Sequence, residues 1–276
     1  MSGATSGIGA AAALGLARHG ARVFIVGRNR ARGEATLARI QSETGNPDIE
    51  LLLADMSEQR QVRALAADIR ARTSKLDVLV NNAGAFFLRR TLSADGIEMT
   101  FALNHLSYFL LVNELLDLIG PAAPARIINV ASSAHYNGRL DFGNLQLTRG
   151  YGGMRAYAQS KLCNILHARE LASRLAGTGI TANALHPGFV HTRIGQNNGI
   201  LVRILARLIF RFGRTPEQGA DTIVYLATDR DAGAYSGKYF VDRKPVPPTA
   251  QALDAELAKK LWAVSAQLTD SDLPEF

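Results

Sequence analysis

The chain opens on the glycine-rich stretch Ser2-Gly3-Ala4-Thr5-Ser6-Gly7-Ile8-Gly9, which runs directly into an Ala/Leu-rich segment over residues 10–18. A tight glycine turn at the start of a helix can hold a phosphate, because small residues let the backbone approach and free N–H groups face the anion. The apolar run at residues 22–26 predicts a buried strand. Turn, helix and strand together make half of a nucleotide-binding unit. A purely structural glycine turn is the alternative, since the spacing differs from the G-x-G-x-x-G fingerprint.

The rest of the chain alternates short apolar runs with longer helical ones. Further strands are expected at residues 49–54, 76–80, 126–130, 180–185 and 237–241. Helices are expected at residues 30–44, 58–72, 98–118, 155–176 and 216–227, and an exposed terminal helix that carries Trp262 is expected at 250–268. Residues 134–153 are polar and glycine-rich and predict a long loop with a functional role. With 276 residues, the chain has room for one α/β domain or two small ones.

The composition excludes several classes of function. The chain is 47% apolar and 20% charged, which is ordinary for a globular protein. Its net charge of +7 comes from dispersed basic residues, so an anionic cofactor explains it better than nucleic acid does. One cysteine, Cys163, excludes a disulfide framework and fits a buried structural thiol, and six scattered histidines show no metal-ligand spacing. No apolar run is long enough to span a membrane and no signal peptide is evident, so we expect a cytoplasmic protein.

Polar residues follow three of the expected strands, at the sheet edge where ligands bind in open α/β proteins. Arg28 stands near the position where an acidic residue would select NAD, and therefore favours the 2′-phosphate of NADP; a helix-capping or surface Arg is the alternative. Asp55, followed by Met56, could contact an adenine or cap the helix that begins near Ser57. The run Asn81-Asn82-Ala83-Gly84 suits a loop that holds a central turn together and lets a ribose approach.

Two more polar positions lie in apolar surroundings. Asn104, in the pair Asn104-His105, interrupts an apolar helix and is either a satisfied core residue or one that holds water behind an active site. Ser132 follows a strand and could donate a hydrogen bond to a substrate oxygen, although a serine there is usually a turn residue.

A phenol and an ammonium lie four residues apart in Tyr157-Ala158-Gln159-Ser160-Lys161, on one face of the expected helix. A nearby cation favours the phenolate, so we expect the pKa of Tyr157 to fall from its usual value of about 10 toward neutrality. Such a tyrosine can exchange a proton with a substrate oxygen. Taken alone, an exposed tyrosine beside a solvated lysine is about as probable, and only the surrounding residues decide between the two.

The pattern as a whole resembles the short-chain dehydrogenase/reductase family over essentially the full chain. The residues that carry the resemblance are Gly3-x-x-x-Gly7-x-Gly9, Asn81-Asn82-Ala83-Gly84, Asn104, Ser132, Tyr157-x-x-x-Lys161 and Pro187-Gly188. The local runs at 103–106, 131–135, 184–188, 215–219 and 236–242 are similar to the retinol dehydrogenase branch. The resemblance implies a single Rossmann domain over residues 1–276, with a doubly wound parallel sheet, that interconverts an alcohol and a carbonyl on a small-molecule substrate with NADP(H).

The resemblance also implies a role for each residue. Tyr157 would donate or accept the proton, Lys161 would lower its pKa and hold the nicotinamide ribose, Ser132 would polarise the substrate oxygen, and Asn104 would hold a water that links Lys161 to solvent. The glycines of the turn would hold the pyrophosphate, Arg28 the 2′-phosphate, Asp55 the adenine, and Asn82 and Thr192 the other end of the cofactor. The full expected cofactor set is Gly3, Ser6, Gly7, Ile8, Gly9, Arg28, Asp55, Met56, Asn82, Ala83, Gly84, Tyr157, Lys161, Pro187, Gly188, Val190 and Thr192.

Two features depart from the family pattern. The family's first strand, which precedes the glycine turn, is reduced to Met1-Ser2. Because that strand is central in the sheet, we expect its two neighbouring strands to have unpaired edges. Either the start codon is misassigned or the sequence is a fragment. An upstream extension of about 5–6 residues should then stabilise the protein, and equal thermal stability of both versions would contradict this. The membrane anchor of similar animal enzymes is not found ahead of the turn, so a membrane location does not follow from the resemblance.

The substrate side is less determined. We expect a substrate-binding segment at about residues 189–215, with apolar contacts from Phe86-Phe87-Leu88 and from residues 200–212, where arginines on one side also suit peripheral membrane contact. Ordinary core packing is the alternative for both. A catalytically silent cofactor-binding sensor and an inactive truncated product are the competing functional hypotheses. The sequence leaves the specific substrate, the direction of reaction and the oligomeric state open, and a homo-oligomer is compatible with it.

Overall fold

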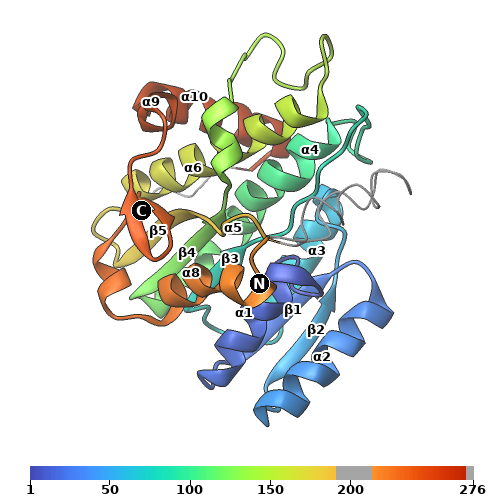
Figure 1. Cartoon of the computed structure of the whole chain (residues 1–276), viewed down its shortest axis with the longest axis vertical. Coiled ribbons are helices and arrows are strands. Elements are labelled where there is room, and N and C mark those ends of the chain that lie inside the picture. Colours follow the sequence, from blue (N-terminus) through green and yellow to red (C-terminus); the bar gives the residue numbers. More distant parts are fainter. Residues whose placement is uncertain (191–212, 272–276) are drawn as a thin grey trace.

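The computed structural model describes residues 1–190 and 213–271, in which parallel strands lie between two layers of helices (Figure 1). β1 (Val23–Gly27) pairs with β2 (Ile49–Leu53) as a parallel two-stranded sheet. The second sheet has the order β3-β4-β5-β6-β7. Its strands are β3 (Val78–Asn81), β4 (Ala125–Val130), β5 (Ile180–His186), β6 (Tyr239–Val241) and β7 (Lys244–Val246), and all neighbours are parallel except the β6–β7 pair.

The first four residues lie between the two sheets. The backbone N–H of Val26 in β1 donates to the Met1 carbonyl at 3.0 Å, and Ala4 N–H donates back to Val26. On the other side, Ser2 N–H donates to the Val80 carbonyl of β3, also at 3.0 Å. No strand precedes the glycine turn among the described residues, so these few bonds join β1 to β3 in place of a full ladder.

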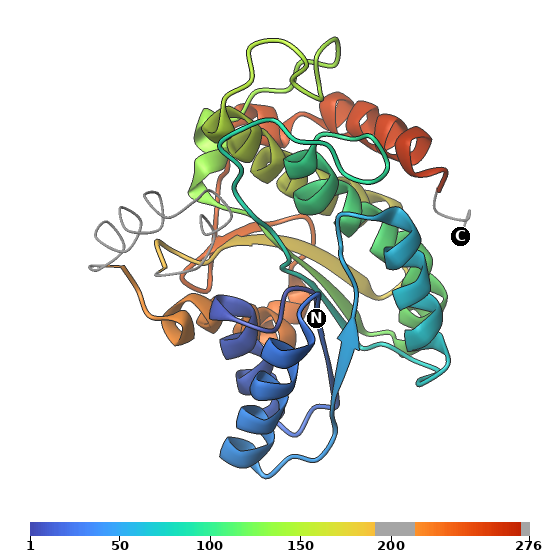
Figure 2. The ribbon, with the colours of Figure 1, turned by 90° about the vertical axis from the view of Figure 1, so that its right-hand side faces the viewer.

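Each face of the sheet is covered by its own group of helices (Figure 2). One layer contains α1 (Gly7–Arg18), α2 (Arg30–Thr44) and α8 (Pro216–Thr228). The other contains α3 (Gln59–Arg70), α5 (Ser107–Ile119), α6 (Gly153–Arg174) and α10 (Ala255–Thr269). Small residues allow α1 to pack closely, since a Cβ at Gly15 would come within 2.6 Å of Val224 in α8. The doubly wound architecture expected from the sequence is confirmed.

The helix expected at residues 98–118 is interrupted. A short α4 (Met99–Phe101) leads into a π-helical turn, η1 (Ala102–Leu106), and α5 continues from Ser107. The buried side chain of Asn104 exchanges hydrogen bonds with the backbone N–H and carbonyl of Ala85, at 2.9 and 3.0 Å. The Ser107 hydroxyl donates to the Leu103 carbonyl. Single π-turns in α-helices are frequent at functional sites, and here the turn places Asn104 against the loop that follows β3.

The C-terminal helix also differs from the expectation. It consists of α9 (Ala250–Leu253) and α10, and the side chain of Asp254 between them caps α10 by accepting from Leu257 N–H. The expectation that Trp262 lies on an exposed helix is wrong. Its side chain is 3% exposed, and its ring packs edge-on against Phe109 of α5 with centroids 4.7 Å apart.

Shorter elements complete the chain. The 3-10 helices are η2 (Gly120–Ala122), η3 (Ser133–Asn137) and η6 (Asp231–Ala234), so η3 occupies the start of the segment expected to be a loop. The antiparallel strand β7 was not expected, because its turn, Asp242–Arg243, takes positive φ angles without a glycine. The expected apolar segment at 200–212 lies outside the described residues.

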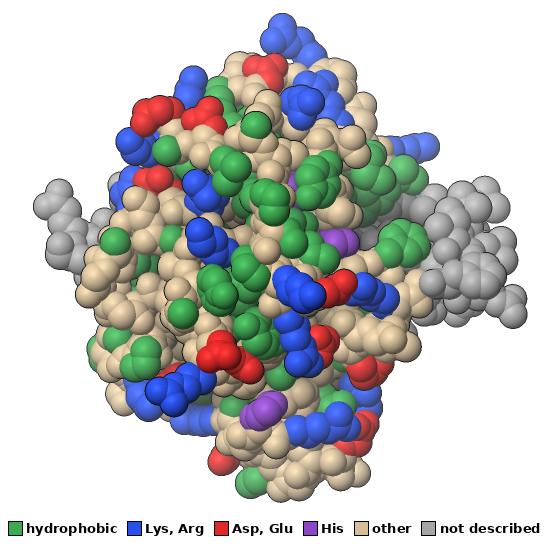
Figure 3. All heavy atoms as spheres, turned by 60° about the vertical axis from the view of Figure 1, so that its left-hand side comes forward, with side chains coloured by type: hydrophobic (Ala, Val, Ile, Leu, Met, Phe, Trp, Pro, Cys, Tyr) green, Lys and Arg blue, Asp and Glu red, His purple; other side chains and the backbone are tan. Residues whose placement is uncertain are grey.

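The surface carries interspersed charges. On the face in Figure 3, Lys and Arg side chains alternate with Asp and Glu, and many of the basic residues form ion pairs, such as Arg243 with Asp221 and Arg70 with Asp117. Within residues 1–190 and 213–271, no helix combines the length and hydropathy that crossing a bilayer requires.

Candidate active site

The carboxyl ends of the parallel strands open onto a cleft of about 780 Å³, a volume typical of cofactor and substrate sites. Most of the expected site residues line it: Gly3, Ser6, Ile8, Gly9, Arg28, Asp55, Met56, Asn82, Ala83, Gly84, Ser132, Tyr157, Lys161, Pro187, Gly188 and Val190. Gly7 and the buried Asn104 are not among the lining residues, and Thr192 falls outside the described residues. Segments far apart in the chain therefore meet at one sheet edge, as the strand topology requires.

The glycine turn forms a cradle that side chains would fill. A Cβ at Gly9 would lie 2.2 Å from the Gly3 carbonyl oxygen, and a Cβ at Gly3 would lie 2.7 Å from the Cα of Ala83. Gly3 and Gly7 take φ angles of +63° and +53°, which favour glycine. Helix α1 begins at Gly7, and the side chain of its N-cap residue, Ser6, makes no capping hydrogen bond. Its first-turn N–H groups thus fit a pyrophosphate.

Asn82 ties the turn to the end of β3. Its amide Nδ2 donates to the carbonyl oxygens of Ser2 and Gly3, at 3.0 and 3.1 Å. In return, the Ser2 hydroxyl oxygen accepts from the backbone N–H groups of Asn82 and Ala83. Since the side chain of Ser2 is 1% exposed, this reciprocal set of bonds fixes the position of the cradle against the second sheet.

Charged residues occupy the far end of the cleft. Arg28 and Asp55 form an ion pair at 3.3 Å. Burial alone would raise the pKa of Asp55, but hydrogen bonds from Ser57 and the charge of Arg28 hold it below its usual value. Asp55 accepts from the backbone N–H and hydroxyl of Ser57 and so stabilises the turn before α3, but the N-cap of this helix is Glu58, so the alternative that Asp55 caps the helix is wrong. Arg32 lines the same end; the sequence signal for it, overlooked above, is a second arginine four residues after Arg28.

Tyr157 and Lys161 lie one helical turn apart on α6, with the Lys161 Nζ 5.5 Å from the Tyr157 ring centroid. The ammonium is 3% exposed and donates to the Val130 carbonyl at 3.0 Å. Burial lowers the pKa of Lys161 to about 7. Burial also raises the pKa of Tyr157 to about 12, and a hydrogen bond with Ser132 opposes this rise. The expected fall of the Tyr157 pKa toward neutrality is therefore wrong for this structure, because the partial burial of this cleft-lining tyrosine raises its pKa by more than the neighbouring groups lower it.

Asn104 lies near Lys161, on the opposite side of Gly84. A Cβ at Gly84 would lie 3.3 Å from Asn104 Oδ1 and 3.6 Å from Lys161 Nζ, so both side chains flank this glycine. The Asn104 amide also donates to the Ser160 hydroxyl at 3.0 Å. Both polar atoms of its side chain are thus bonded to protein, which makes Asn104 a brace between α6 and the loop after β3; its link to water remains a prediction.

Apolar side chains surround the outer part of the cleft. The Phe86 ring packs edge-on against Tyr157, with centroids 6.0 Å apart. Met154 and Phe189 also line the cleft and are 60% and 55% exposed. Phe86 was expected at a substrate mouth from its apolar run, and Phe189 begins the segment of residues 189–215 that was expected to bind substrate, whereas Met154 was not expected. Met154 precedes Tyr157 by one helical turn, which is the signal that could have identified it.

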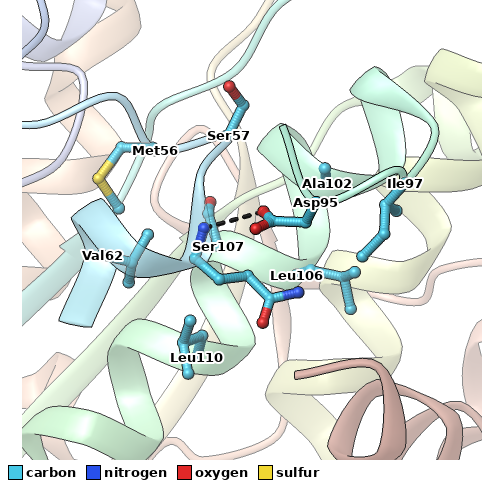
Figure 4. Close-up of a pocket in the computed structure, with 10 residues that line it drawn as sticks. Met56, Ser57, Val62, Asp95, Ile97, Ala102, Leu106, Ser107 and Leu110 are labelled. Carbon is cyan, nitrogen blue, oxygen red and sulfur yellow. Dashed lines mark hydrogen bonds between the residues drawn. The ribbon is translucent and has the colours of Figure 1, made fainter. Parts of the chain in front are cut away.

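A second cavity is too small to hold a substrate. It has a volume of about 10 Å³, room for about one water molecule. It lies between the start of α3 and the π-helical turn, beside Met56 and Leu106 (Figure 4). The Asp95 carboxylate at its edge accepts the backbone N–H of Gln59 at 3.0 Å and so caps α3. This cavity is a packing feature next to the cleft.

Comparisons with known proteins agree with this arrangement. Residues 1–200 match the family described as short chain dehydrogenase. The chain is 40% identical to retinol dehydrogenase 12 of Mus musculus, over 97% of this chain and 84% of the relative. It is 39% identical to retinol dehydrogenase 13 of Homo sapiens, over 99% of this chain and 85% of the relative.

Solved structures show the same fold. A crystal structure of a protein from Mycobacterium paratuberculosis is 32% identical, with a TM-score of 0.81 and coverage of 99% of this chain and 93% of that one. The active-site complex of Pseudomonas aeruginosa RhlG with NADP is 27% identical, with a TM-score of 0.70 and coverage of 93% and 94%. The fold binds a nicotinamide cofactor, and the chain is an oxidoreductase that acts on CH–OH groups. This protein belongs to the short-chain dehydrogenase/reductase family, in the retinol dehydrogenase branch.

Proposed function

We propose that this protein is an NADP(H)-dependent oxidoreductase that interconverts an alcohol and a carbonyl on a lipophilic substrate, with Tyr157 as the acid/base. The observation that carries the proposal is the convergence of Ser132, Tyr157 and Lys161 in one cleft beside the glycine cradle. A hydroxyl donor, a phenol and an ammonium in this arrangement can stabilise and protonate an oxygen on which negative charge develops.

The residues have distinct tasks in carbonyl reduction. Ser132 Oγ accepts the Ala134 N–H at 3.2 Å, so the serine hydrogen is directed to the Tyr157 oxygen in this structure and would be donated to the substrate oxygen when a substrate is bound. With a pKa of about 12, Tyr157 is protonated at neutral pH and gives its proton to that oxygen. The positive charge of Lys161 stabilises the phenolate that remains. The nicotinamide, when bound, supplies the hydride. Alcohol oxidation uses the same groups in reverse.

Preference for NADP(H) is supported by the basic end of the cleft. Arg28 and Arg32 lie near the end of β1, and no acidic residue follows this strand directly. A guanidinium binds phosphate through charge-assisted hydrogen bonds that contribute about 1.5–3 kcal/mol. We therefore expect Arg28→Ser to lower kcat/KM with NADPH roughly 10- to 100-fold and to leave kcat/KM with NADH nearly unchanged. A clear preference of the wild type for NADH would refute this part of the proposal.

A lipophilic substrate is supported by the apolar wall formed by Phe86, Met154 and Phe189, and by the retinol dehydrogenase names of the relatives. A panel of retinal, medium-chain aldehydes and steroid ketones, each offered with NADPH and NADH, identifies the substrate class. Equal activity on small hydrophilic aldehydes would contradict the assignment. The substrate-binding role of residues 189–215 and membrane contact through residues 200–212 remain predictions.

Tyr157→Phe tests the mechanism. The variant should bind NADPH as the wild type does, while kcat falls by about 10²- to 10⁴-fold. Tyr235→Phe, which removes a phenol on the opposite layer beside Phe240, is the matched control and should retain wild-type turnover. Unchanged turnover in Tyr157→Phe would refute the mechanism, and a wild type that binds NADPH without turning over any carbonyl would favour the alternative, a cofactor-binding sensor.

A further inference from the structure

The turn after β4 holds the Ser132 carbonyl with two donors from one residue. The backbone N–H of His135 donates to this oxygen at 3.1 Å, and the imidazole Nδ1 donates to it at 2.8 Å. Ser132 is also the N-cap of η3, and its hydroxyl oxygen accepts the Ala134 N–H. The peptide plane after Ser132 and the direction of its hydroxyl are therefore set within the same four residues.

The His135 ring is enclosed and held in one orientation. It is 0% exposed and packs between Tyr136 and Tyr239, with ring centroids at 4.2 and 4.8 Å. Burial lowers its pKa, and the hydrogen bond to Ser132 only partly opposes this, so the ring is neutral at pH 7. A neutral imidazole carries one hydrogen. Since a carbonyl oxygen only accepts, that hydrogen lies on Nδ1.

The same turn is packed directly on the helix that carries Tyr157 and Lys161. A Cβ at Gly138, the last residue of the turn, would lie 2.7 Å from the Ala158 carbonyl and 3.0 Å from the Cβ of Leu162. These two residues each follow one of the reacting side chains. A change in the shape of the turn therefore changes the distance between the Ser132 hydroxyl and the Tyr157 phenol.

We infer that His135 is a positioning residue, which orients the Ser132 hydroxyl toward the reacting oxygen through the Nδ1 hydrogen bond to the Ser132 carbonyl. The inference rests on the proposed function, since it assigns to Ser132 the task of donating to the substrate. A ring that only filled the space between Tyr136 and Tyr239 would need no donor at Nδ1. The two roles make opposite predictions for substitutions that separate packing from hydrogen bonding.

Three substitutions separate them. In His135→Asn, the amide Nδ2 takes the position of the imidazole Nδ1, so the donor is kept while most of the ring is lost. In His135→Gln, the amide takes the position of Nε2, which faces away from Ser132. In His135→Leu, apolar volume remains but the donor is lost. Purified variants should be compared by thermal unfolding, by kcat and KM with NADPH, and by the pH profile of alcohol oxidation.

If His135 positions Ser132, kcat should be high in the variants that keep a hydrogen-bond donor at the Nδ1 position and low in those that lose it. His135→Leu and His135→Gln should lose about 10- to 100-fold in kcat, the scale expected for a misplaced catalytic group, with little change in KM for NADPH. His135→Asn should recover most of this loss even where it is less stable than His135→Leu. The apparent pKa of Tyr157 should rise in the Leu and Gln variants, because Ser132 then no longer opposes the effect of burial.

The inference would be overturned if kcat correlated with thermal stability, so that the kcat of His135→Leu equalled or exceeded that of His135→Asn. If His135→Leu does not fold, the comparison of Asn with Gln decides alone, since both are polar amides. Tyr239→Phe keeps the packed ring beside His135 and serves as the control, with wild-type kcat expected. Ser132→Ala separates the two proposals: full activity of this variant refutes the assigned role of Ser132, whereas a defect in Ser132→Ala with equal activity of the three His135 variants refutes only the inference on His135.

Discussion

Replacing Lys161 by methionine should stabilise the cofactor-free protein while it abolishes turnover. Burial lowers the pKa of this ammonium from 10.5 to about 7, which corresponds to about 5 kcal/mol for keeping the buried charge. Methionine has a similar length and no charge, but loses the hydrogen bond to the Val130 carbonyl, a loss of about 1–2 kcal/mol. We therefore expect a net gain of about 3 kcal/mol in the free energy of unfolding at pH 6.

The gain depends on pH in a defined direction. Below pH 7 the lysine is charged in both the folded and the unfolded state, so the full penalty of burial is present. Above pH 10.5 it is neutral in both states and the penalty is gone. Between these values the unfolded state binds more protons, so the stability of the wild type rises with pH. The advantage of Lys161→Met should thus shrink between pH 7 and 10.5 and end as a small disadvantage.

Urea unfolding at pH 6, 8 and 10 measures this, with the fluorescence of the single tryptophan, Trp262, as the probe. Lys244→Met, which changes an exposed lysine of β7, is the matched control and should change stability by less than about 0.5 kcal/mol at every pH. A Lys161→Met variant that is less stable than the wild type at pH 6, or a difference that does not vary with pH, would refute the reasoning.

Two further predictions follow from buried groups. Burial lowers the pKa of His105 from 6.5 to about 3. Below pH 6.5 the unfolded state therefore binds one more proton than the folded state, which lowers the free energy of unfolding. His105→Gln should reduce this loss between pH 7 and 5 by about 2 kcal/mol in urea titrations. Replacing the exposed His19 is the control and should leave the loss unchanged. In Gly9→Ala, the new methyl group would lie 2.2 Å from the Gly3 carbonyl oxygen, so fluorescence titration should show NADPH affinity reduced by at least roughly 10-fold. Gly120→Ala is the control, because a Cβ at Gly120 has no atom within 4 Å. Equal NADPH affinity of both variants would argue against the cradle.

The parts of the site that the sequence predicted depend on local geometry. Tyr157 and Lys161 share a face because the helical pitch requires it. Asn82 and Ser132 follow buried strands, and the carboxyl ends of parallel strands meet at one edge. In both cases the position of the residue within its helix, or at the end of its strand, determines where the side chain lies.

The features that the sequence did not predict depend on contacts between distant segments. The π-helical turn forms where Asn104 bonds to Ala85, 19 residues earlier. Trp262 is buried because its ring meets Phe109. The pKa of Tyr157 depends on how far the folded chain buries its phenol. The spacing of residues along the sequence does not predict that burial. His135 was overlooked because its role depends on a hydrogen bond within a turn that polar composition describes only as a loop.

Ser132 is the N-cap of η3, and the proposed mechanism also assigns it the donor to the substrate, so one side chain would have both a structural and a catalytic task. Some catalytic residues reduce stability, so that replacing them stabilises the protein at the cost of activity. Lys161 is of that kind. Ser132 is not, because its removal takes away a helix cap along with the reaction. Selection for a folded chain and selection for an active one would therefore favour the same side chain at this position.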